Sequence, residues 1–375
     1  MRRFLCLFLC LFIIFENINV CALSAQSSVL MDAASGRVLA AQNENVRRGM
    51  ASTTKIMTAV VALEQGNPDD IVTVSNRAAN VEGSSMWLKP GEKIKLESLL
   101  YGLMLNSGND AATAIAEHVG GSVEGFAEMM NKKAAQLGLK DTHFTNPHGL
   151  DNEKHYTTAY ELGLIACYAL KNEKFREIAA TKQKTVEGLE NGLTRTLNNH
   201  NKMLKLYDNA DGVKTGFTKK CGRCLVSSAT RNGMQLVAVT LNAPDDWNDH
   251  KSLLNYGFAK YKPKTLVTKG SYVKTVPVKN GRSAGVGAVI GDTVSVAVKQ
   301  GENPVLKIDM PESLDAPVVL GQKLGTACAM LGGKEYAKAD ITAQIGVAKR
   351  LSSDTMDTAY YLAMELLSFF VEIKQ

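Results

Sequence analysis

The sequence predicts an α+β protein, in which an antiparallel sheet is covered by a cluster of helices and followed by a small all-β domain. Three observations favour this fold. Strand-like segments lie at both ends of residues 26–262, and helical spacing of apolar residues fills the part between them. Residues 263–345 are rich in Val, Gly and Lys, with short alternating strands and Gly and Asn turns. Residues 350–375 have apolar side chains around most of a helical circumference, which predicts a terminal amphipathic helix.

The composition is that of an ordinary globular protein, long enough for two domains. The chain has 375 residues, of which 45% are hydrophobic and 21% charged, and its formal net charge is +6. No basic run and no basic patch interleaved with aromatic residues accompanies this mild charge, so we expect no nucleic-acid binding. Seven cysteines are present, and those beyond the N-terminal segment are too few for a disulfide framework.

Residues 1–25 are predicted to be a secretory signal peptide. Two arginines precede an unbroken apolar run over residues 4–15, and small residues follow, with cleavage expected after Ala22 or Ala25. The run is short for a membrane span, although an uncleaved N-terminal anchor is the alternative. We therefore expect an exported protein at the outer face of the cytoplasmic membrane or in the cell wall.

Local patterns place the expected elements in order along residues 26–262. A hairpin is expected where residues 27–31 and 37–41 flank a Gly-containing turn. Helices are expected from residue 53 and over 96–105, 110–120, 123–137, 158–170 and 253–261. Two strands are expected over 225–229 and 234–241, joined by the turn Arg231-Asn232-Gly233. Strands from both ends of this segment would then pair in one antiparallel sheet.

The predicted terminal helix has its polar residues on one narrow stripe. Asp357, Glu365, Ser368 and Glu372 recur at helical spacing, and the rest of the surface is nearly all apolar. Such a helix must bury most of its surface, and we expect residues 350–375 to associate with a membrane surface. Docking against the rest of the protein is the alternative, because the stripe is acidic rather than basic.

Ser52 and Lys55 form an S-x-x-K motif at the start of the first expected helix. Positions i and i+3 share a helical face, so the Lys55 amine can reach the Ser52 hydroxyl. A serine becomes a nucleophile when a base takes its proton, and a lysine with a lowered pKa can be that base. Backbone N–H groups at a helix start can also stabilise an oxyanion. The pair alone is weak evidence, because a capping serine beside a solvated lysine has the same pattern.

Two further short motifs strengthen this interpretation. Ser107-Gly108-Asn109 lies between two expected helices, where a loop could direct a hydroxyl and an amide into a cleft. Lys214-Thr215-Gly216 precedes the strand expected over 225–229, and Gly216 would allow a substrate backbone to approach closely. Each motif is common by itself. The three together, in this order and at these separations, indicate a serine acyl-transfer site.

With these motifs, residues 24–262 resemble the serine-type D-alanyl-D-alanine carboxypeptidases of peptidase family S11, which are low-molecular-mass penicillin-binding proteins. The resemblance extends to the stretches GSSMWLKPGEKIKLESLLYGLMLNSGNDAATAIAEHVGG, FTNPHGLDNEKHYTTAYELGLIA, NHNKML and DGVKTGFT. It implies the β-lactamase/transpeptidase-like fold, with an antiparallel sheet and a helix cluster. The signal peptide, the β-rich domain and the terminal helix also match the family's usual layout.

The resemblance implies a role for each matching residue. Ser52 would attack the carbonyl between the two terminal D-alanines of a peptidoglycan stem pentapeptide, forming an acyl-enzyme and releasing D-alanine in cell-wall or spore-cortex maturation. Lys55 would be the general base. Ser107 and Asn109 would carry protons and hold the acyl amide, with help from Lys214. Water would then hydrolyse the acyl-enzyme.

The resemblance also implies how substrates and inhibitors bind. Thr215, beside Gly216, would donate a hydrogen bond to the terminal carboxylate of the substrate. The backbone N–H groups of Ser52 and Phe217 would form the oxyanion hole. β-Lactam antibiotics would trap Ser52 covalently. No metal and no organic cofactor is expected.

The chain departs from the family pattern in one part of the expected site. Many relatives carry an arginine shortly before the segment that matches LLNYGF, whereas this chain has Asp245-Asp246-Trp247-Asn248 there. Carboxylate recognition is therefore expected to rest on Lys214 and Thr215 alone. Three other functions stay open: D,D-endopeptidase cleavage of cross-links, a β-lactamase using Glu153 or Glu161, and a non-catalytic cell-wall scaffold.

Cysteines and histidines near these motifs suggest redox or metal chemistry as a further alternative. Cys221 and Cys224 form a C-x-x-C motif beside Lys214-Thr215-Gly216, but no second motif of this kind accompanies them. A short disulfide between them is left open for an exported protein. His148 and His155 belong to no H-x-x-x-H pattern, so structural hydrogen bonds are expected for both.

Overall fold

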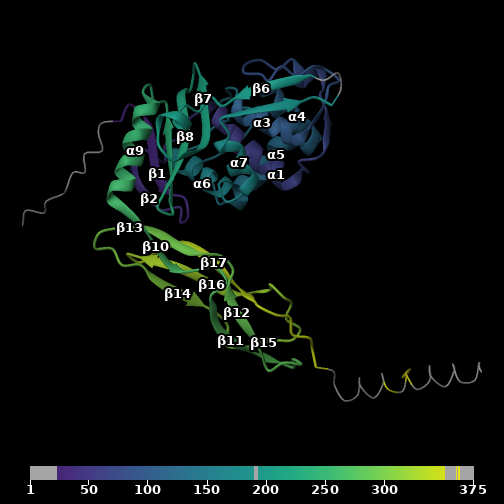
Figure 1. Cartoon of the computed structure of the whole chain (residues 1–375), viewed down its shortest axis with the longest axis vertical. Helices are drawn as coiled ribbons and strands as arrows, with labels where there is room; N and C mark the ends of the chain where they lie inside the picture. Colours follow the sequence, from purple (N-terminus) through teal and green to yellow (C-terminus); the bar gives the residue numbers. More distant parts are fainter. Residues whose placement is uncertain (1–22, 190–192, 351–359, 361, 364–375) are drawn as a thin grey trace, which may run out of the picture.

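The computed structural model describes residues 23–189, 193–350, 360, 362 and 363. Most of the predicted signal peptide and most of the predicted terminal helix lie outside these residues. Within the described segments, no helix is long and apolar enough to span a membrane. Two structural units follow one another along the chain: a larger unit of sheet and helices, and a smaller unit of strands (Figure 1).

The larger unit is built on a five-stranded antiparallel sheet with the order β2-β1-β9-β8-β7. Its strands are β1 (Ser27–Asp32), β2 (Val38–Gln42), β7 (Ala210–Thr218), β8 (Gly222–Arg231) and β9 (Met234–Leu241). β1 pairs with β9 although the two strands lie at opposite ends of the unit's sequence. The predicted antiparallel sheet, made from both ends of this segment, is therefore confirmed.

Helices cover both faces of this sheet (Figure 1). On one face, α9 (Asp246–Lys260) packs against β8 and β9, and on the other, α6 (Ala159–Ala169) packs against β1 and β9. The alternation along β1 explains this division, since Val29 and Met31 pack within the helix cluster while Leu30 packs with α9. The cluster also contains α1 (Lys55–Gln65), α3 (Leu96–Leu105), α4 (Asn109–Gly120), α5 (Val123–Gln136) and α7 (Glu173–Ala180).

The predicted helices α3, α4, α5 and α6 are confirmed within one residue at each end. One prediction about this unit was wrong. The last helix, α9, begins at Asp246 rather than near residue 253, because its first turns bury the polar side chains of Asp249 and His250 and so lack apolar spacing. Lys214-Thr215-Gly216 lies in the strand β7 and precedes β8, the strand expected over 225–229.

Several short elements were not predicted from the sequence. They are β3 (Ile71–Thr73), α2 (Asn76–Ala79), β4 (Lys93–Lys95), β5 (Gln183–Glu187), β6 (Thr194–Asn198) and α8 (Met203–Leu206). The strands form two antiparallel pairs, β3–β4 and β5–β6, with mostly exposed side chains. Segments of this length and polarity show no apolar period, which explains why the pattern did not reveal them.

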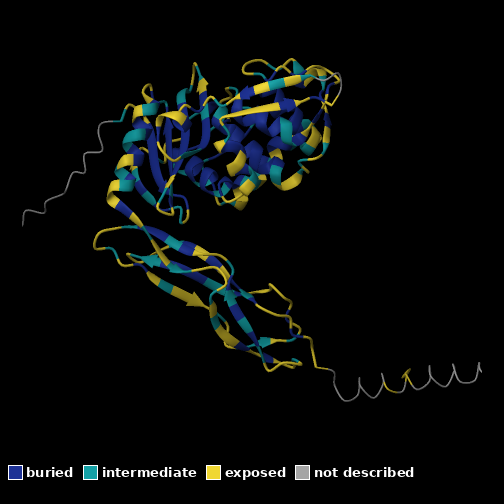
Figure 2. Cartoon of the chain, viewed as in Figure 1, coloured by how far each residue is buried: buried dark blue, intermediate teal, exposed yellow. Residues whose placement is uncertain are grey.

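The centre of the helix cluster is buried on nearly all sides (Figure 2). In α4 every residue from Asn109 to Ala116 is buried, and this helix packs against α1, α2, α3 and α5. Small side chains such as Ala111, Ala112 and Ala114 allow these neighbours to approach closely. The first residue of α4 is therefore held inside the core.

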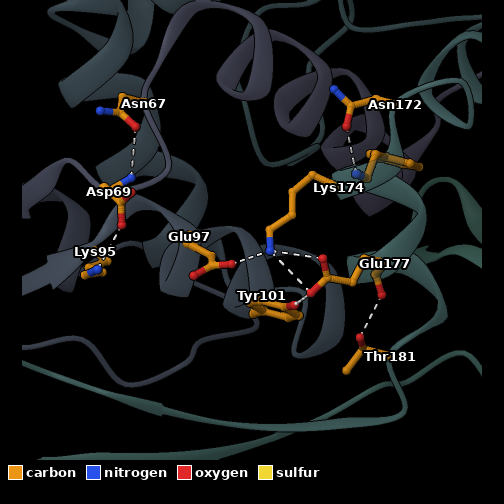
Figure 3. Close-up of polar contacts among 10 residues, drawn as sticks. Asn67, Asp69, Lys95, Glu97, Tyr101, Asn172, Lys174, Glu177 and Thr181 are labelled. Carbon is orange, nitrogen blue, oxygen red and sulfur yellow. Dashed lines mark hydrogen bonds and ion pairs between the residues drawn. The ribbon is translucent and has the colours of Figure 1, made fainter.

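Charged side chains tie α3 to α7 (Figure 3). Lys174 on α7 forms ion pairs with Glu97 on α3 and with Glu177, whose carboxylate lies 3.0 Å from Lys174 Nζ. Tyr101 on α3 donates a hydrogen bond of 2.6 Å to Glu177, and burial, together with this bond, raises the pKa of Tyr101 to about 12. Because α3 leads directly into Ser107-Gly108-Asn109, this network fixes the helix that delivers part of the candidate site.

The smaller unit is all-β, as predicted. Its strands are β10 (Tyr261–Val267), β11 (Tyr272–Lys279), β12 (Gly285–Ile290), β13 (Val294–Lys299), β14 (Val305–Asp309), β15 (Leu314–Asp315), β16 (Lys323–Leu331) and β17 (Lys334–Ala343). Six form a sheet of order β14-β16-β17-β12-β11-β15, and β10 pairs with β13. Valine and alanine side chains make up most of its core. The chain leaves this unit at the end away from the larger unit (Figure 1).

Arg37 joins the two units. Its guanidinium donates hydrogen bonds of 2.6 and 2.8 Å to the Glu302 carboxylate and one of 2.6 Å to the Ala297 carbonyl. Asp32, from the same turn, accepts a hydrogen bond of 2.9 Å from the Ala297 N–H. The turn between β1 and β2 is therefore bonded directly to β13 of the smaller unit.

Candidate active site

A tight turn brings the predicted nucleophile to the start of a helix. Ser52 lies in a 3-10 turn, Ala51–Thr54, and Lys55 is the first residue of α1. Ala51 has a φ of 47°, which is uncommon for a residue with a side chain. The Thr54 hydroxyl donates a hydrogen bond of 2.8 Å to the Ala51 carbonyl and so supports this turn.

Lys55 is buried, and its side-chain nitrogen has three polar neighbours. Nζ lies 3.0 Å from Oγ of Ser52, 2.7 Å from Oδ1 of Asn109 and 2.7 Å from the carbonyl oxygen of His148. Burial, reinforced by the positive charge of Lys214, holds the pKa of Lys55 well below its usual value. The structure thus brings the predicted nucleophile and the predicted base into hydrogen-bond contact.

The loop between α3 and α4 contributes a second pair of residues. Ser107 is buried, has a φ of 60° and lines the same cleft as Ser52. Asn109 begins α4, and while its Oδ1 contacts Lys55, its Nδ2 donates a hydrogen bond of 2.6 Å to the Glu82 carbonyl. Both ends of this amide are engaged by the protein, so Asn109 positions Lys55.

Strand β7 places the third motif against the Ser52 turn. A Cβ atom at Gly216 would lie 3.0 Å from the backbone nitrogen of Ser52, so this close approach requires glycine. Lys214 is buried, and burial lowers its pKa to about 7. Thr215 lines the cleft, and Phe217 is 64% exposed at its edge.

These motifs surround an open cleft of about 330 Å³, called here the Ser52 cleft. Its lining consists of Ser52, Ser84, Ser107, His200, Lys202, Thr215, Gly216, Phe217, Arg223, Asp246 and Trp247. Arg223 was not predicted as a site residue. It lies opposite Phe217 in the β7–β8 pair, and the sequence alone does not fix the register that brings it there.

A buried carboxylate fixes the loop beside this cleft. Asp110 accepts hydrogen bonds of 3.0 and 3.1 Å from the backbone N–H groups of Met86 and Leu88, and one of 2.5 Å from the Ser85 hydroxyl. Trp87, between them, has a φ of 64° and is 79% exposed. A bulky residue in this backbone region requires such support, so Asp110 holds a strained loop in place.

Family models match both units of the chain. Residues 16–245 match the model of D-alanyl-D-alanine carboxypeptidases, and residues 261–349 match that of the C-terminal domain of penicillin-binding protein 5. The chain belongs to the D-alanyl-D-alanine carboxypeptidase family. The family expected from the sequence motifs is thereby confirmed.

Individual carboxypeptidases and solved structures agree with this assignment. The chain is 36% identical over 337 residues to D-alanyl-D-alanine carboxypeptidase DacF of Bacillus subtilis, covering 87% of this chain and 86% of that one. The structure of penicillin-binding protein 5 from Haemophilus influenzae matches with a TM-score of 0.67 at 32% identity, over 87% of this chain and 98% of that one. The Streptomyces K15 DD-transpeptidase matches with a TM-score of 0.61 at 37% identity, over 63% of this chain and 98% of that one.

The histidines near the site of this carboxypeptidase make structural hydrogen bonds, as predicted. His155 contacts the Thr54 hydroxyl through Nε2 at 2.8 Å and accepts a hydrogen bond of 3.1 Å from the Thr145 N–H. His148 contacts Lys55 through its backbone carbonyl rather than its ring. Burial lowers the pKa of His155 to about 4 and that of His148 to about 3, so both rings are neutral at pH 7.

Cys221 and Cys224 are free thiols in the structure. Cys221 Sγ lies 3.1 Å from Oδ1 of Asp151, and Cys224 Sγ lies 3.9 Å from the Gly49 carbonyl oxygen. Burial raises the pKa of Cys224 to about 12, which keeps it a protonated thiol. Neither cysteine lines the Ser52 cleft.

The two glutamates considered for a β-lactamase lie away from the Ser52 cleft of this carboxypeptidase. Glu161 is buried, and its carboxylate accepts hydrogen bonds of 3.0 Å from the Asp141 N–H and 2.5 Å from the Thr142 hydroxyl. Glu153 lines a different hollow, together with Arg47. Neither glutamate is therefore placed to activate water at Ser52.

Proposed function

We propose that this chain is a serine D,D-carboxypeptidase that removes the terminal D-alanine from peptidoglycan stem pentapeptides during cell-wall or spore-cortex maturation. The contact between Ser52 and Lys55 carries this proposal. A buried amine with a depressed pKa lies 3.0 Å from a hydroxyl that lines an open cleft, so it is suited to take the proton of that hydroxyl. Family membership supports the substrate class.

In the acylation step, neutral Lys55 accepts the hydroxyl proton while Ser52 Oγ attacks the carbonyl carbon of the penultimate D-alanine. The two N–H groups of the neutral amine donate to Oδ1 of Asn109 and to the His148 carbonyl, which leaves its lone pair for the hydroxyl. The C–N bond breaks as a proton reaches the leaving nitrogen, and D-alanine departs. Ser107 lines the cleft and is suited to pass this proton.

Backbone N–H groups of Ser52 and Phe217 stabilise the oxyanion that forms in this step. The close approach of β7 to the Ser52 turn at Gly216 supports this role. One such donor typically contributes about 3–4 kcal/mol to the stability of the transition state. Thr215, in the cleft beside them, donates a hydrogen bond to the substrate carboxylate.

Deacylation restores the enzyme. Water attacks the ester carbon while Lys55 accepts its proton. The bond to Ser52 Oγ then breaks as Lys55 returns the proton to Oγ, and the shortened peptide leaves with the new carboxylate. A β-lactam acylates the same oxygen when its ring opens, so we expect β-lactams to block the enzyme by occupying Ser52.

The direct test is release of D-alanine from a pentapeptide ending in D-Ala-D-Ala. Ser52→Ala should abolish the release, whereas Ser283→Ala, at an exposed serine of the smaller unit, should leave it unchanged. Release that persists without Ser52 would refute its role as nucleophile. The same preparation is also offered cross-linked muropeptide dimers and penicillin, which separate the other functions. Cleavage of the dimers would indicate an endopeptidase, and fast turnover of penicillin would indicate a β-lactamase. Stable penicillin binding without turnover of any substrate would indicate a scaffold.

We also propose that residues 1–25 direct export and that residues 350–375 associate with the outer face of the cytoplasmic membrane. Their sequence patterns support this location, and extracytoplasmic peptidoglycan requires it. Deletion from residue 352 onward should release the protein from the membrane fraction. Sedimentation of the truncated protein with membranes would contradict the role of this segment.

A further inference from the structure

Arg223 is the single arginine among the described residues that line the Ser52 cleft. It is the second residue of β8 and pairs with Phe217 of β7, two positions beyond Thr215. Paired residues of an antiparallel sheet have side chains on the same face, as do residues two apart in one strand. Thr215 and Arg223 therefore lie on the same face of the sheet, and both line the cleft.

Two residues at the start of α9 hold the Arg223 side chain. Asp246 Oδ1 lies 2.8 Å from Nη2 of Arg223, and the Asp246 side chain is 3% exposed where that of Arg223 is 41% exposed. The guanidinium also lies over the Trp247 ring, 5.4 Å from its centroid. A buried carboxylate and an aromatic ring thus fix the orientation of a cation whose other side meets the cleft.

The guanidinium keeps donors that the described part of the protein does not use. The bond to Asp246 uses Nη2, and Nη1 has no hydrogen-bond partner among the described residues, on a side chain that is 41% exposed. An arginine has five N–H donors in a planar fork that matches the geometry of a carboxylate. The vacant donors therefore suit an anionic ligand.

The other cations near the cleft are less suited to this task. Lys214 is buried and is not among the described residues that line the cleft, and burial lowers its pKa to about 7, so its amine loses its charge as the pH rises above neutral. Lys202 lines the cleft but is exposed, so its flexible ammonium is not held in one place. The Arg223 side chain, in contrast, is held by Asp246 and Trp247.

We propose that Arg223 binds the free C-terminal carboxylate of the substrate, beside the Thr215 hydroxyl, and so makes the enzyme specific for a free carboxyl end. Asp246 and Trp247 are its positioning residues. This inference rests on the proposed function, because it requires a peptide substrate with a terminal carboxylate. The expectation that Lys214 and Thr215 alone recognise the carboxylate is replaced by this arrangement.

The test compares two peptides that differ at one group. One pentapeptide ends in D-Ala-D-Ala with a free carboxylate, and the other ends in the corresponding C-terminal amide. Arg223→Gln should lower kcat/KM for the free acid roughly 10- to 100-fold, mainly through KM, and change that for the amide less than about twofold. Arg223→Lys should recover part of the loss, since a lysine keeps the charge without the fork. Asp246→Asn should produce a smaller loss that is also selective for the free acid.

If Arg223→Gln lowers kcat/KM equally for the free acid and the amide, the proposal is overturned, because equal losses indicate a structural role for Arg223. The proposal would also be overturned if Lys202→Gln lowered kcat/KM selectively for the free acid and Arg223→Gln did not. If the wild-type protein cleaves the amide too slowly to measure, acylation by a penicillin and by its methyl ester gives the same comparison. A wild-type protein that turns over neither peptide and is acylated by neither penicillin would instead refute the proposed function itself.

The unmodified protein provides a second measurement, in case the Arg223 variants do not fold. The preference for free acid over amide should persist at pH 9, above the pKa of about 7 to which burial lowers Lys214. A preference that disappears between pH 6 and pH 9 would assign carboxylate recognition to Lys214 and overturn the role of Arg223.

Discussion

The Nζ atom of Lys55 lies 2.7 Å from Oδ1 of Asn109, so the proposed base on α1 is oriented by the first residue of α4. α4 is buried over its first eight residues and cannot shift without disturbing the helix cluster. Ser52, on the other side of the amine, belongs to a turn held by its own hydrogen bonds. The separation of nucleophile and base is therefore set by core packing.

The orientation of Lys55 by a neutral amide leads to a prediction about pH. Asn109→Asp would place a carboxylate beside Lys55 and raise the pKa of the amine, because an opposite charge favours its protonated form. Acylation requires the neutral amine, so its rate falls as the pH drops through the pKa of Lys55, and the variant should show this fall at higher pH. Stopped-flow acylation with a fluorescent penicillin measures the profile. Asn80→Asp, at an exposed position, is the control, and an unshifted profile in Asn109→Asp would contradict Lys55 as the base.

Lys214 should lower the stability of the enzyme near neutral pH. Its pKa falls from 10.5 to about 7 on folding, so between these values the unfolded chain binds more protons than the folded one. The contribution of Lys214 to the free energy of unfolding therefore decreases as the pH falls from 10.5 to 7.

Lys214→Met should consequently raise the free energy of unfolding at pH 7 by a few kcal/mol, on the order of what the pKa shift implies, while it impairs catalysis. The difference from wild type should shrink as the pH rises towards 10.5. Urea denaturation at several pH values measures both effects. Lys219→Met, at an exposed position of the following turn, should show no such trend. If Lys214→Met instead lowers the free energy of unfolding, the buried Lys214 ammonium is stabilised by the folded protein and does not destabilise it.

Asp110 should be essential to the loop that carries Trp87. Asp110→Asn replaces a carboxylate by an amide with one acceptor oxygen, so some of the N–H and O–H donors from residues 85–88 lose their partner. We expect a loss of about 2–3 kcal/mol in the free energy of unfolding and faster hydrogen exchange at Met86 and Leu88. The control is Asp309→Asn, in the smaller unit. If hydrogen exchange at Met86 and Leu88 is no faster in Asp110→Asn than in this control, another contact holds the loop.

The junction between the units should depend on Arg37. Its side chain is 10% exposed and that of Glu302 is 19% exposed, so removing the arginine leaves a largely buried carboxylate unpaired. Arg37→Ala should lower the free energy of unfolding by about 1–3 kcal/mol and make the segment after α9 more sensitive to protease, with D-alanine release from a short peptide unchanged. The double variant Arg37→Ala/Glu302→Ala should lose less than the two single variants add up to. Additive losses would mean that the ion pair does not couple the units.

The chemistry of the site could be predicted from the sequence because it depends on local motifs. Ser52 and Lys55 are close in sequence, and the apolar residues of α3 and α4, the helices on either side of Ser107, indicate both helices. The sheet was predictable for the same reason, since β8 and β9 are two strand-forming segments joined by a Gly-containing turn. These elements are encoded by neighbouring residues and are little affected by distant ones.

Arg223 could not be predicted in the same way. Its place in the cleft depends on the register between β7 and β8 and on the position of α9, whose early start brings Asp246 and Trp247 to the guanidinium. β7 itself has a buried lysine where an apolar residue would be expected. A charged residue that is buried for function interrupts the apolar period of its element, so the element is not recognised from the sequence pattern.

The bonds of Arg37 and Asp32 to β13 have a consequence for where the enzyme can cut. They fasten the smaller unit to the turn between β1 and β2, and the chain leaves that unit at its far end (Figure 1). Strands of nine or ten residues, such as β16 and β17, span about 30 Å. If residues 350–375 associate with the membrane as proposed, the smaller unit would therefore hold the Ser52 cleft at a nearly constant distance from its surface.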